Sequence, residues 1–456
     1  MSSASAAGSG PPSRFPGPAD PSPYAPRIRG VSPGSNRLAF LLILVSAFPL
    51  AGRALDSLAA ASASPRPPVV DVLKFIPSSL HTAIRAGTDR TDLSRYVQAA
   101  IDNCLEDAGL QDWAKRGRGP RGRGTVTFPP GSYHVRNVLL RSGVDIHLPK
   151  GTTVRLCDNA VDARMRPPYP PSNVFCTTLD HTGNYEDPRF GPQRWFQGAG
   201  DRKVPVLTPE QRAGRYGTQG EFIVEDVRIY GEGTIDGNRG RNTLGDSGEN
   251  ASAMGSGVCL HQARNLTVSG LTIRNARMDG VSMGYTLHGG TYDSAVERCT
   301  ILDSGRNAIS LITGWNNRIV GNTFGGSTGS DVDIEGNWDG EVDARHLVSG
   351  NTGTAAVAIA AKGAVRSDGC RVEKNRFGRL HLYPRNAQGS VVEGNRFVGN
   401  GKDAAITVGG PEGMYAPVEV RDNAFENHAR TFDGTQGPTE GSHRGMILKR
   451  NDFRKR

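Results

Sequence analysis

The sequence predicts an all-β solenoid, a fold in which short strands wind into stacked coils. The first observation is a phrase of asparagine and phenylalanine that returns every 20–29 residues between Asn322 and Asn451, and a period of this size is typical of solenoids. The second is that valine- and isoleucine-rich runs with alternating polar residues flank each copy, which predicts strands. The third is composition, because 59 glycines and only 7% aromatic residues in 456 suit thin coils.

The repeated phrase also predicts how the coils stack. Its copies are Gly321–Phe324, Lys374–Phe377, Gly394–Phe397, Asp422–Phe425 and Arg450–Phe453, with a looser copy at Asn351. Coils of such a solenoid lie ~4.8 Å apart, so identical residues at one position form ladders. We expect each asparagine to adopt the left-handed turn conformation and to hydrogen-bond along the stack. Each phenylalanine is expected to stack inside the coils.

The N-terminal region precedes the repeat domain. Residues 1–36 are rich in Pro, Ser, Ala and Gly, and we expect them to be a disordered leader. The apolar run Leu38–Leu50 follows three arginines and is short for a membrane span, so residues 37–64 are predicted to be a signal peptide or an uncleaved anchor. We therefore expect a secreted, periplasmic or cell-surface protein, whose only membrane contact would be an anchor at residues 38–50.

The charge balance bears on the partner. A formal net charge of +9 favours anionic partners, and we expect an acidic polysaccharide. Nucleic acid is disfavoured, because the polar face of the strands is mixed in charge and is not a basic track with stacked aromatic residues. We expect a monomer, with a trimer as the alternative.

The six cysteines are scattered and include no CxxC pair, which argues against a zinc site. In an exported protein some could form disulfides, and Cys157 and Cys176 bracket a loop. Buried free thiols are the alternative.

The elements follow in order. Residues Thr91–Leu105 have the pattern of one amphipathic helix, opened by the capping signals Thr91 and Asp92. Strands are expected from Thr125 to Leu156 and again from Phe222 almost to the end of the chain. Between them, residues 158–220 break the strand pattern with prolines, arginines and aromatic residues. We interpret this segment as a long functional loop inserted into a β-helix domain of residues 65–456.

The stretch Gly124–Leu156 resembles the opening coils of the pectinase-type right-handed parallel β-helix proteins, the polygalacturonases in particular. Residues Gly87–Cys104 are similar to the amphipathic helix that caps that fold, and Val227–Asn238 to the next landmark of the family. The resemblance covers roughly residues 70–456. It implies a single-stranded right-handed parallel β-helix with an N-terminal capping α-helix. It leaves the reaction open, because the superfamily includes hydrolases, lyases, epimerases and phage tailspikes.

The polygalacturonase motifs are only partly present. The family's Asn-Thr-Asp-Gly corresponds to residues 277–280, which keep Asp279 alone. Its Gly-Asp-Asp corresponds to residues 305–307, which hold neither acid, and its Gly-His-Gly lies near residues 329–331, which hold no histidine. The resemblance therefore implies a catalytic role for Asp279 and for no other member of that set.

Strand alternation points the residues between the inward apolar ones to the outer face of the coils, provided that no bulge shifts the register. Asp331, Asp333 and Glu335 are then neighbours on one strand, ~7 Å apart. This separation suits the carboxylate pair of an inverting glycosidase. We expect hydrolysis of a glycosidic bond by Asp279, Asp333 and Glu335, with Asp331 in substrate binding.

A basic and aromatic set is expected two coils later, on the same face. It consists of His381 as a catalytic residue and of Lys362, Tyr383 and Arg385 as substrate-binding residues. Uronic-acid lyases and epimerases need a cation that neutralises the substrate carboxylate and a base that removes a proton, so such an enzyme is the first alternative. Arg306 near the same groove could bind a substrate carboxylate with two hydrogen bonds. A non-catalytic glycan-binding or surface-structural β-helix is the second alternative.

We expect no cofactor, with calcium as the open alternative. The acidic run Asp331–Val342 resembles an EF-hand loop at its acidic positions, but Val342 stands where the bidentate glutamate belongs. A looser calcium site could use Asp339, Glu341 or Asp343.

Overall fold

The computed structural model describes fifteen segments of the 456-residue chain: residues 67–107, 124–158, 173–177, 186–187, 191–192, 224–242, 255–261, 263–284, 290–336, 343–359, 367–382, 387–408, 418–432, 441–443 and 446–454. They belong to one compact unit, Pro65–Arg456. The expected disordered leader and the expected signal peptide or anchor lie outside the described residues. Within these fifteen segments, no helix is long and apolar enough to cross a membrane.

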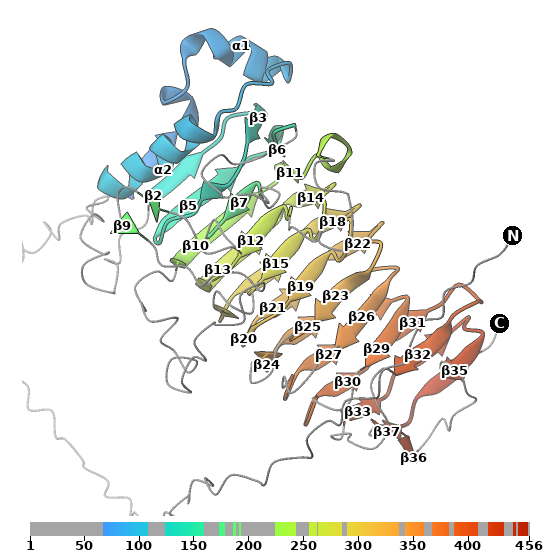
Figure 1. Ribbon diagram of the computed structural model, residues 1–456. Helices are drawn as coiled ribbons and strands as arrows, with labels where there is room; N and C mark the ends of the chain where they lie inside the picture. Colours follow the sequence, from blue (N-terminus) through green and yellow to red (C-terminus); the bar gives the residue numbers. More distant parts are fainter. Residues whose placement is uncertain are drawn as a thin grey trace, which may run out of the picture. The chain divides into compact units, whose positions relative to one another are not determined.

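Most strands belong to three faces of one stack of coils (Figure 1). Sheet A contains β1 (Val69–Asp71), β2 (Gly124–Thr127), β5 (Val144–Leu148), β10 (Val224–Gly231), β13 (Ala263–Ser269), β16 (Thr291–Tyr292), β17 (Ala295–Glu297), β20 (Gly314–Trp315), β21 (Arg318–Val320), β24 (Asp343–Ala344), β25 (Leu347–Ser349), β27 (Arg371–Glu373), β30 (Val391–Glu393), β33 (Val418–Arg421), β36 (Gly441–His443) and β37 (Met446–Lys449). Only β36 runs antiparallel to its neighbour among these strands.

The second face, sheet B, consists of two pieces joined by bridges through Thr352. Its strands are β3 (Gly131–Val135), β6 (Thr152–Leu156), β11 (Thr234–Asp236), β14 (Thr272–Arg274), β18 (Thr300–Leu302), β22 (Thr323–Gly325), β28 (Arg376–Phe377), β31 (Arg396–Val398), β34 (Ala424–Glu426) and β38 (Asp452–Arg454). A separate antiparallel pair is formed by β8 (Glu186–Asp187) and β9 (Gly191–Pro192).

Sheet C is the third face and is parallel throughout its described strands. Its strands are β4 (Val138–Leu139), β7 (Phe175–Cys176), β12 (Val258–Leu260), β15 (Val281–Met283), β19 (Ile309–Leu311), β23 (Ser330–Ile334), β26 (Ala356–Ile359), β29 (Arg379–Leu382), β32 (Ala404–Val408) and β35 (Arg430–Phe432). Each coil visits sheets A, B and C in turn and pairs with the coils before and after it. The predicted parallel β-helix is therefore confirmed.

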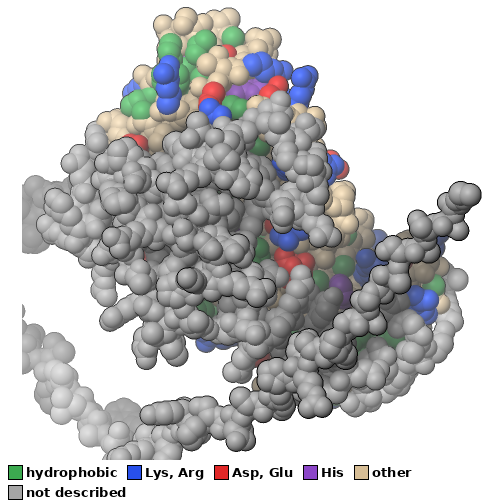
Figure 2. All heavy atoms as spheres, in the orientation of Figure 1, with side chains coloured by type: hydrophobic (Ala, Val, Ile, Leu, Met, Phe, Trp, Pro, Cys, Tyr) green, Lys and Arg blue, Asp and Glu red, His purple; other side chains and the backbone are tan. Residues whose placement is uncertain are grey.

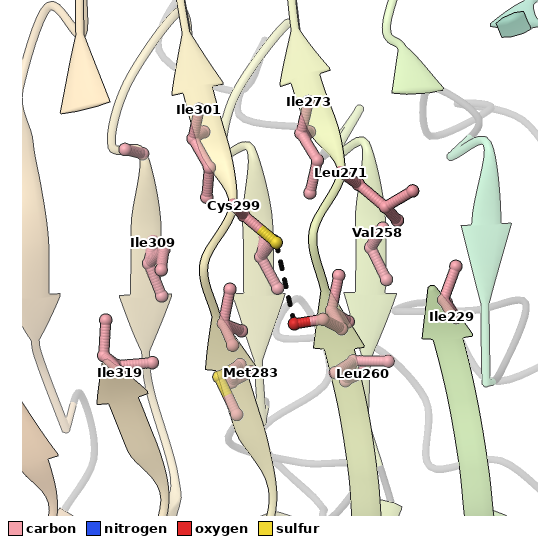
Figure 3. Packing of buried hydrophobic residues seen from close by; sticks show 14 of the residues in the cluster. Ile229, Val258, Leu260, Leu271, Ile273, Met283, Cys299, Ile301, Ile309 and Ile319 are labelled. Carbon is pink, nitrogen blue, oxygen red and sulfur yellow. Dashed lines mark hydrogen bonds between the residues drawn. The ribbon is translucent and has the colours of Figure 1, made fainter. Parts of the chain in front are cut away.

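The core runs along the inside of the stack. Successive coils contribute one aliphatic side chain at each inward position, as Ile273 and Ile301 do on neighbouring strands of sheet B (Figure 3). Cys299 lies among these side chains, and its thiol donates a hydrogen bond to the Val268 carbonyl oxygen at 3.6 Å. Inward valine and isoleucine suit a parallel strand, because their branched side chains fit the pleated surface.

Two helices cover the first coils, α1 (Ser78–Ala86) and α2 (Ser94–Asp107). The Asp92 carboxylate accepts a hydrogen bond from the Ser94 backbone N–H at 3.0 Å, as its predicted capping role requires. The Gln98 amide of α2 accepts from the Leu139 N–H at 2.8 Å and donates to the Leu139 carbonyl at 3.2 Å. A side chain of α2 therefore satisfies the backbone of the first strand of sheet C, which confirms the capping role predicted for this helix.

The asparagines stack as predicted, but they do not themselves adopt the left-handed conformation. Each amide nitrogen donates to the amide oxygen of the next asparagine, at 2.9 Å from Asn375 to Asn395. The residue before the asparagine has positive φ, as Lys374 (57°) and Asp422 (54°) show. The sequence expectation was wrong by one residue, because the asparagine needs a regular backbone to point its amide along the stack. The phenylalanines stack inside, with ring centroids 4.8 Å apart for Phe397 and Phe425.

The ladder predicts a measurable stability loss. The Asn375 amide donates to the Val348 carbonyl at 2.9 Å, and its oxygen accepts the Asn351 backbone N–H at 2.8 Å. Asn375→Ala leaves these buried groups without partners, so we expect the free energy of unfolding to fall by about 2–3 kcal/mol. Urea denaturation measures this loss. Asn400→Ala, at an exposed asparagine, should change stability by less than about 0.5 kcal/mol; equal losses in the two variants would contradict the ladder's role.

The number of residues between successive strands is constant at one corner of the coil and variable at another. Between sheets A and B the corner is two residues long in the five coils that carry the repeated phrase, as at residues 321–322, 374–375 and 394–395. From sheet C to sheet A, residues 312–313 separate β19 from β20 in one coil, whereas β23 ends at Ile334 and β24 begins at Asp343 in the next. The asparagine ladder therefore holds one corner at constant length, while the corner after sheet C varies.

The inserted segment is not wholly outside the solenoid. Residues 173–177 lie within the predicted 158–220 insertion, yet β7 pairs with β4 on one side and β12 on the other. The chain thus completes one strand of sheet C inside this segment. All six cysteines are free and buried, which agrees with the buried-thiol alternative, and Cys157 and Cys176 do not form a disulfide.

Candidate functional site

One face of sheet C carries five side chains in register, of which Ser282, Ser310 and Ala358 are buried and Asp333 and His381 are partly exposed. Ser282 pairs with Ser310, Ser310 with Asp333, Asp333 with Ala358, and Ala358 with His381. Asp333 and His381 therefore lie on one face, two strands apart, as the sequence predicted. Neighbouring strands are ~4.8 Å apart, which places these two backbone positions ~10 Å from each other. In the view of Figure 2, basic side chains stand beside acidic ones on the visible surface.

Arg306 connects two of the predicted catalytic acids. Its Nε and one terminal nitrogen donate to the two oxygens of Asp279 at 2.8 and 2.6 Å. Its other terminal nitrogen forms an ion pair with the Glu335 carboxylate at 3.0 Å. The side chains of Asp279 and Glu335 are only 2% and 5% exposed. Burial alone would lower the pKa of Arg306, but attraction to Asp279, Glu335 and Asp333 outweighs it and raises that pKa.

The role of Arg306 differs from the predicted one. The sequence predicts that its guanidinium binds a substrate carboxylate, yet in the folded chain the guanidinium donates two hydrogen bonds to the protein's own Asp279. Asp279 also accepts the Asn307 backbone N–H at 3.2 Å. The buried Asp279 and the partly exposed Arg306 therefore form an ion pair that contacts Glu335 through the guanidinium.

Asn307 ties the neighbouring coils together and was not among the predicted site residues. Its amide nitrogen donates to Ser310 Oγ at 3.0 Å and to Asp333 Oδ2 at 3.1 Å, and its amide oxygen accepts the Ser330 N–H at 2.8 Å. Coil alignment places Asn307 at the position of Asp279, one coil later. That alignment could have identified Asn307 as a residue that orients Asp333, which is partly exposed.

Asp331 does not lie on the outer face, so the expected three-acid row is wrong at this position. A bulge between Ser330 and Val332 shifts the register there. The Asp331 side chain is buried, and its Oδ2 accepts the Ala355 N–H at 2.7 Å. Gly353 makes room for it, because a Cβ on Gly353 would stand 2.1 Å from that oxygen. Asp331 therefore fixes the next coil and does not face a substrate.

Asp331 predicts a pH dependence of stability. Burial raises its pKa from 3.8 to about 6, against the opposing hydrogen bonds from Ala355 and Thr354. The native state then binds this proton more tightly than the unfolded state, so its contribution to stability falls as pH rises from about 4 to about 6. Asp331→Asn should gain about 1–3 kcal/mol relative to wild type between pH 4 and pH 7. Urea denaturation at the two pH values measures the gain, and an unchanged difference between the proteins would contradict it.

The second predicted set is only partly described. His381 lies on β29 and is partly buried in the outer row. Lys362, Tyr383 and Arg385 lie outside the described residues, so their predicted roles stay predictions. The structure brings Asp279, Arg306, Asp333 and Glu335 into one site, with His381 further along the same sheet.

A buried histidine, His261, contacts a cysteine and a serine on the coils before the acidic site, and this group was not predicted. His261 Nε2 lies 3.3 Å from both Cys259 Sγ and Ser282 Oγ. The backbone N–H of His261 donates to Thr177 Oγ1 at 2.8 Å. Burial raises the pKa of Cys259, which keeps it a thiol and makes it a weak nucleophile. The only sequence signal was a histidine two residues after a strand cysteine, and we interpret the cluster as structural.

The calcium alternative concerns the same acids. Among the residues that the structure describes, no group of three His, Cys, Asp or Glu side chains is arranged to hold a metal ion. Asp339 and Glu341 lie outside those residues, and Asp343 forms a buried pair with His346 at 2.6 Å. The Asp343 carboxylate therefore has a protein partner, His346, that is neither Asp333 nor Glu335.

Comparison with known proteins supports the fold. Residues 284–453 match the family model described as a right-handed β-helix region. No curated protein matches the chain. The predicted resemblance to pectinase-type right-handed parallel β-helices is therefore confirmed at the level of fold.

Solved structures of similar fold come from several kinds of protein. The tailspike protein of Escherichia coli bacteriophage HK620, in complex with a pentasaccharide, is 15% identical with a TM-score of 0.50, over 85% of this chain and 63% of the tailspike chain. The A-module of the Azotobacter vinelandii mannuronan C-5 epimerase AlgE6 is 13% identical with a TM-score of 0.46, over 85% and 94%. The Streptococcus pneumoniae surface adhesin PfbA is 14% identical with a TM-score of 0.46, over 84% and 91%.

Proposed function

We propose that this protein is a carbohydrate-active β-helix that hydrolyses a glycosidic bond of an acidic polysaccharide on the outer face of sheet C. The observation that carries the proposal is the pair Asp333 and Glu335, two positions apart along one chain segment. Asp333 lies on β23, and the Glu335 N–H donates to the Leu311 carbonyl at 2.7 Å, so Glu335 continues the ladder. Two positions along a strand place the two backbones ~7 Å apart, which is compatible with the separation of about 6.5–9.5 Å between the carboxyl groups of inverting glycosidases.

The environments of the two acids suggest different roles. Glu335 is held by the Arg306 guanidinium, and we assign it as the general base that takes a proton from the attacking water. Asp333 receives its hydrogen bond from the neutral Asn307 amide, and we assign it as the general acid. The water oxygen bonds to the anomeric carbon, the glycosidic C–O bond breaks, and Asp333 protonates the leaving oxygen. Asp279 and Arg306 position Glu335 and do not touch the reacting atoms.

The substrate class rests on two further points. The net charge of +9 favours an anionic polymer. The phage tailspike of similar fold was solved with a pentasaccharide, which supports a carbohydrate as the ligand class. We also propose that the protein is exported, with residues 37–64 as signal peptide or anchor, and that it needs no cofactor. Cell fractionation tests the first of these proposals, and activity after chelation with EDTA tests the second.

Incubation with a panel of uronic-acid polymers tests the reaction. Hydrolysis releases new reducing ends without absorbance near 235 nm (an approximate wavelength at which the unsaturated product of a lyase absorbs, taken as the signature of that reaction class). Absorbance at that wavelength would support a lyase and overturn hydrolysis. A change in sugar composition without cleavage would indicate an epimerase. Binding without any turnover would favour a non-catalytic glycan-binding protein.

A further inference from the structure

Two cysteines lie opposite each other on neighbouring strands of sheet C. Cys176 of β7 and Cys259 of β12 are partners in the parallel register (Figure 1). On one side of the pair, the Phe175 N–H donates to the Gly257 carbonyl at 3.3 Å. On the other side, the Thr177 N–H donates to the Cys259 carbonyl at 3.0 Å, so backbone hydrogen bonds fix the register around both cysteines. Among the strands that the structure describes, these are the only two cysteines.

Both cysteine side chains leave the same face of the sheet. The preceding residues, Phe175 and Val258, belong to the inner core, whereas Cys176, Cys259 and Leu139 form a separate buried cluster. Strand alternation therefore points both cysteines outward from the coils. Neighbouring strands lie ~4.8 Å apart, and a disulfide joins Cα atoms that are about 4.4–6.8 Å apart. The pair thus has the backbone separation and the common direction that a disulfide requires.

The structure describes the reduced form of this pair, in which both cysteines carry thiols. The Cys176 thiol donates to the Val138 carbonyl at 3.8 Å, and Cys259 Sγ lies 3.3 Å from His261 Nε2. Thiols are weak donors and weak acceptors, so little is lost when the two side chains rotate toward each other. Burial raises the pKa of Cys259, and the neighbouring Cys176 raises it further. The two sulfur groups therefore already interact in the folded chain.

We propose that Cys176 and Cys259 form a structural disulfide when the chain folds in the presence of a disulfide oxidant, such as oxidised glutathione or a disulfide-bearing protein. One cysteine thiolate attacks the oxidant to give a mixed disulfide, and the other cysteine then displaces the oxidant's second sulfur. In total, two protein S–H bonds and the oxidant's S–S bond break. The Cys176–Cys259 bond and two S–H bonds on the oxidant form. Two electrons and two protons thus pass from the protein to the oxidant.

Burial determines when this bond forms. The side chains of Cys176 and Cys259 are 0% and 1% exposed, so exchange takes place before the coils close, and the finished bond is protected from reductants. The strand β7 is only two residues long, and the bond ties it to a residue 83 positions later in the sequence. Such a cross-link restricts the unfolded chain and so stabilises the fold. The proposal is independent of the proposed reaction; in the cell it requires the export proposed above, because disulfides persist in oxidising compartments.

Refolding of the full chain from urea, either in a glutathione redox buffer or in excess reductant, tests the disulfide. Each product is then unfolded and alkylated, and mass spectrometry counts its thiols. We expect two fewer thiols after refolding in the redox buffer, and a linked peptide pair that contains Cys176 and Cys259. In Cys176→Ala and in Cys259→Ala this loss of thiols should disappear. The matched control is Cys157→Ala, at the least buried of the six cysteines (9% exposed), and it should keep the full loss.

Two results would overturn the proposal. The first is a linked peptide pair of Cys157 and Cys176, or a loss of thiols that disappears in Cys157→Ala, because the bond would then close the loop between those two residues. The second is an equal number of thiols after the two refolding procedures, with the native circular dichroism spectrum in both products. Peptide mapping uses the wild-type chain, so misfolding of a variant does not obscure the result. Thiol counts are also independent of whether the protein hydrolyses a polysaccharide.

Discussion

Asp333→Asn is expected to lower the release of reducing ends from the polysaccharide substrate by at least about 100-fold. General acid catalysis by a positioned side chain contributes about 10²–10⁴-fold, and the asparagine amide cannot donate a proton to the leaving oxygen. Its side chain keeps the shape of the acid, and its oxygen can still accept the Asn307 hydrogen bond. The loss should therefore appear in kcat, with the fold intact. Reducing-end assays and circular dichroism measure the two quantities.

The matched control for this substitution is Asp422→Asn, which removes an acid from the corner between sheets A and B. Asp422 pairs with Arg450 on the surface at 2.6 Å, so its loss should leave activity within twofold, well inside the about 100-fold effect expected at Asp333. Full activity in Asp333→Asn would falsify the role of Asp333 as the general acid. Equal losses in both variants would point to a general effect of charge on substrate binding.

Arg306→Met is expected to lower the free energy of unfolding by about 3 kcal/mol or more. The substitution leaves Asp279 and Glu335 buried next to an apolar side chain, and removing one partner of a buried ion pair costs about 3–5 kcal/mol. The side chain of Arg306 is 34% exposed, so we expect a loss near the lower end of that range of about 3–5 kcal/mol. Urea denaturation of the full chain measures the loss.

A double-substitution cycle shows where the cost of Arg306→Met comes from. In Arg306→Met combined with Asp279→Asn, one of the two unpaired buried charges is gone, so the double variant should be more stable than Arg306→Met alone. Arg306→Lys keeps the charge but loses the two-bonded geometry with Asp279, and it should fall between wild type and the methionine variant. Strictly additive losses at the two positions would contradict the ion-pair account.

The strands and their order were predictable because the coil repeats. The inward direction of Val332 and Ile334 follows from strand alternation alone, and alignment of the coils predicts that Asp333 and His381 lie on one face. The same alignment brings Asp279 and Arg306 to adjacent coils. It does not predict the direction of the Arg306 side chain, which depends on three carboxylates at once.

The bulge at Asp331 lay beyond sequence reasoning for a different reason. The residues that stabilise it are in the next coil, where Gly353 leaves space for the Asp331 carboxylate and the Ala355 N–H donates a hydrogen bond to that carboxylate. The phrase at Asn351 has glycine in place of phenylalanine, which was visible as a looser repeat. Gly353 is the residue that replaces the phenylalanine, and it lies 22 residues after Asp331. The spacing of the repeat does not indicate that this replacement makes room for a buried acid.

The unequal corners of the coil make the molecule easy to modify in one place and hard to modify in another. An insertion or deletion at the two-residue corner before sheet B would displace an asparagine and interrupt a column of amides that spans six coils, from Asn322 to Asn451. The corner after sheet C already differs in length between neighbouring coils. Loop grafting there would leave the column of amides intact, so the surface of the molecule can be altered without a change in the scaffold that directs folding.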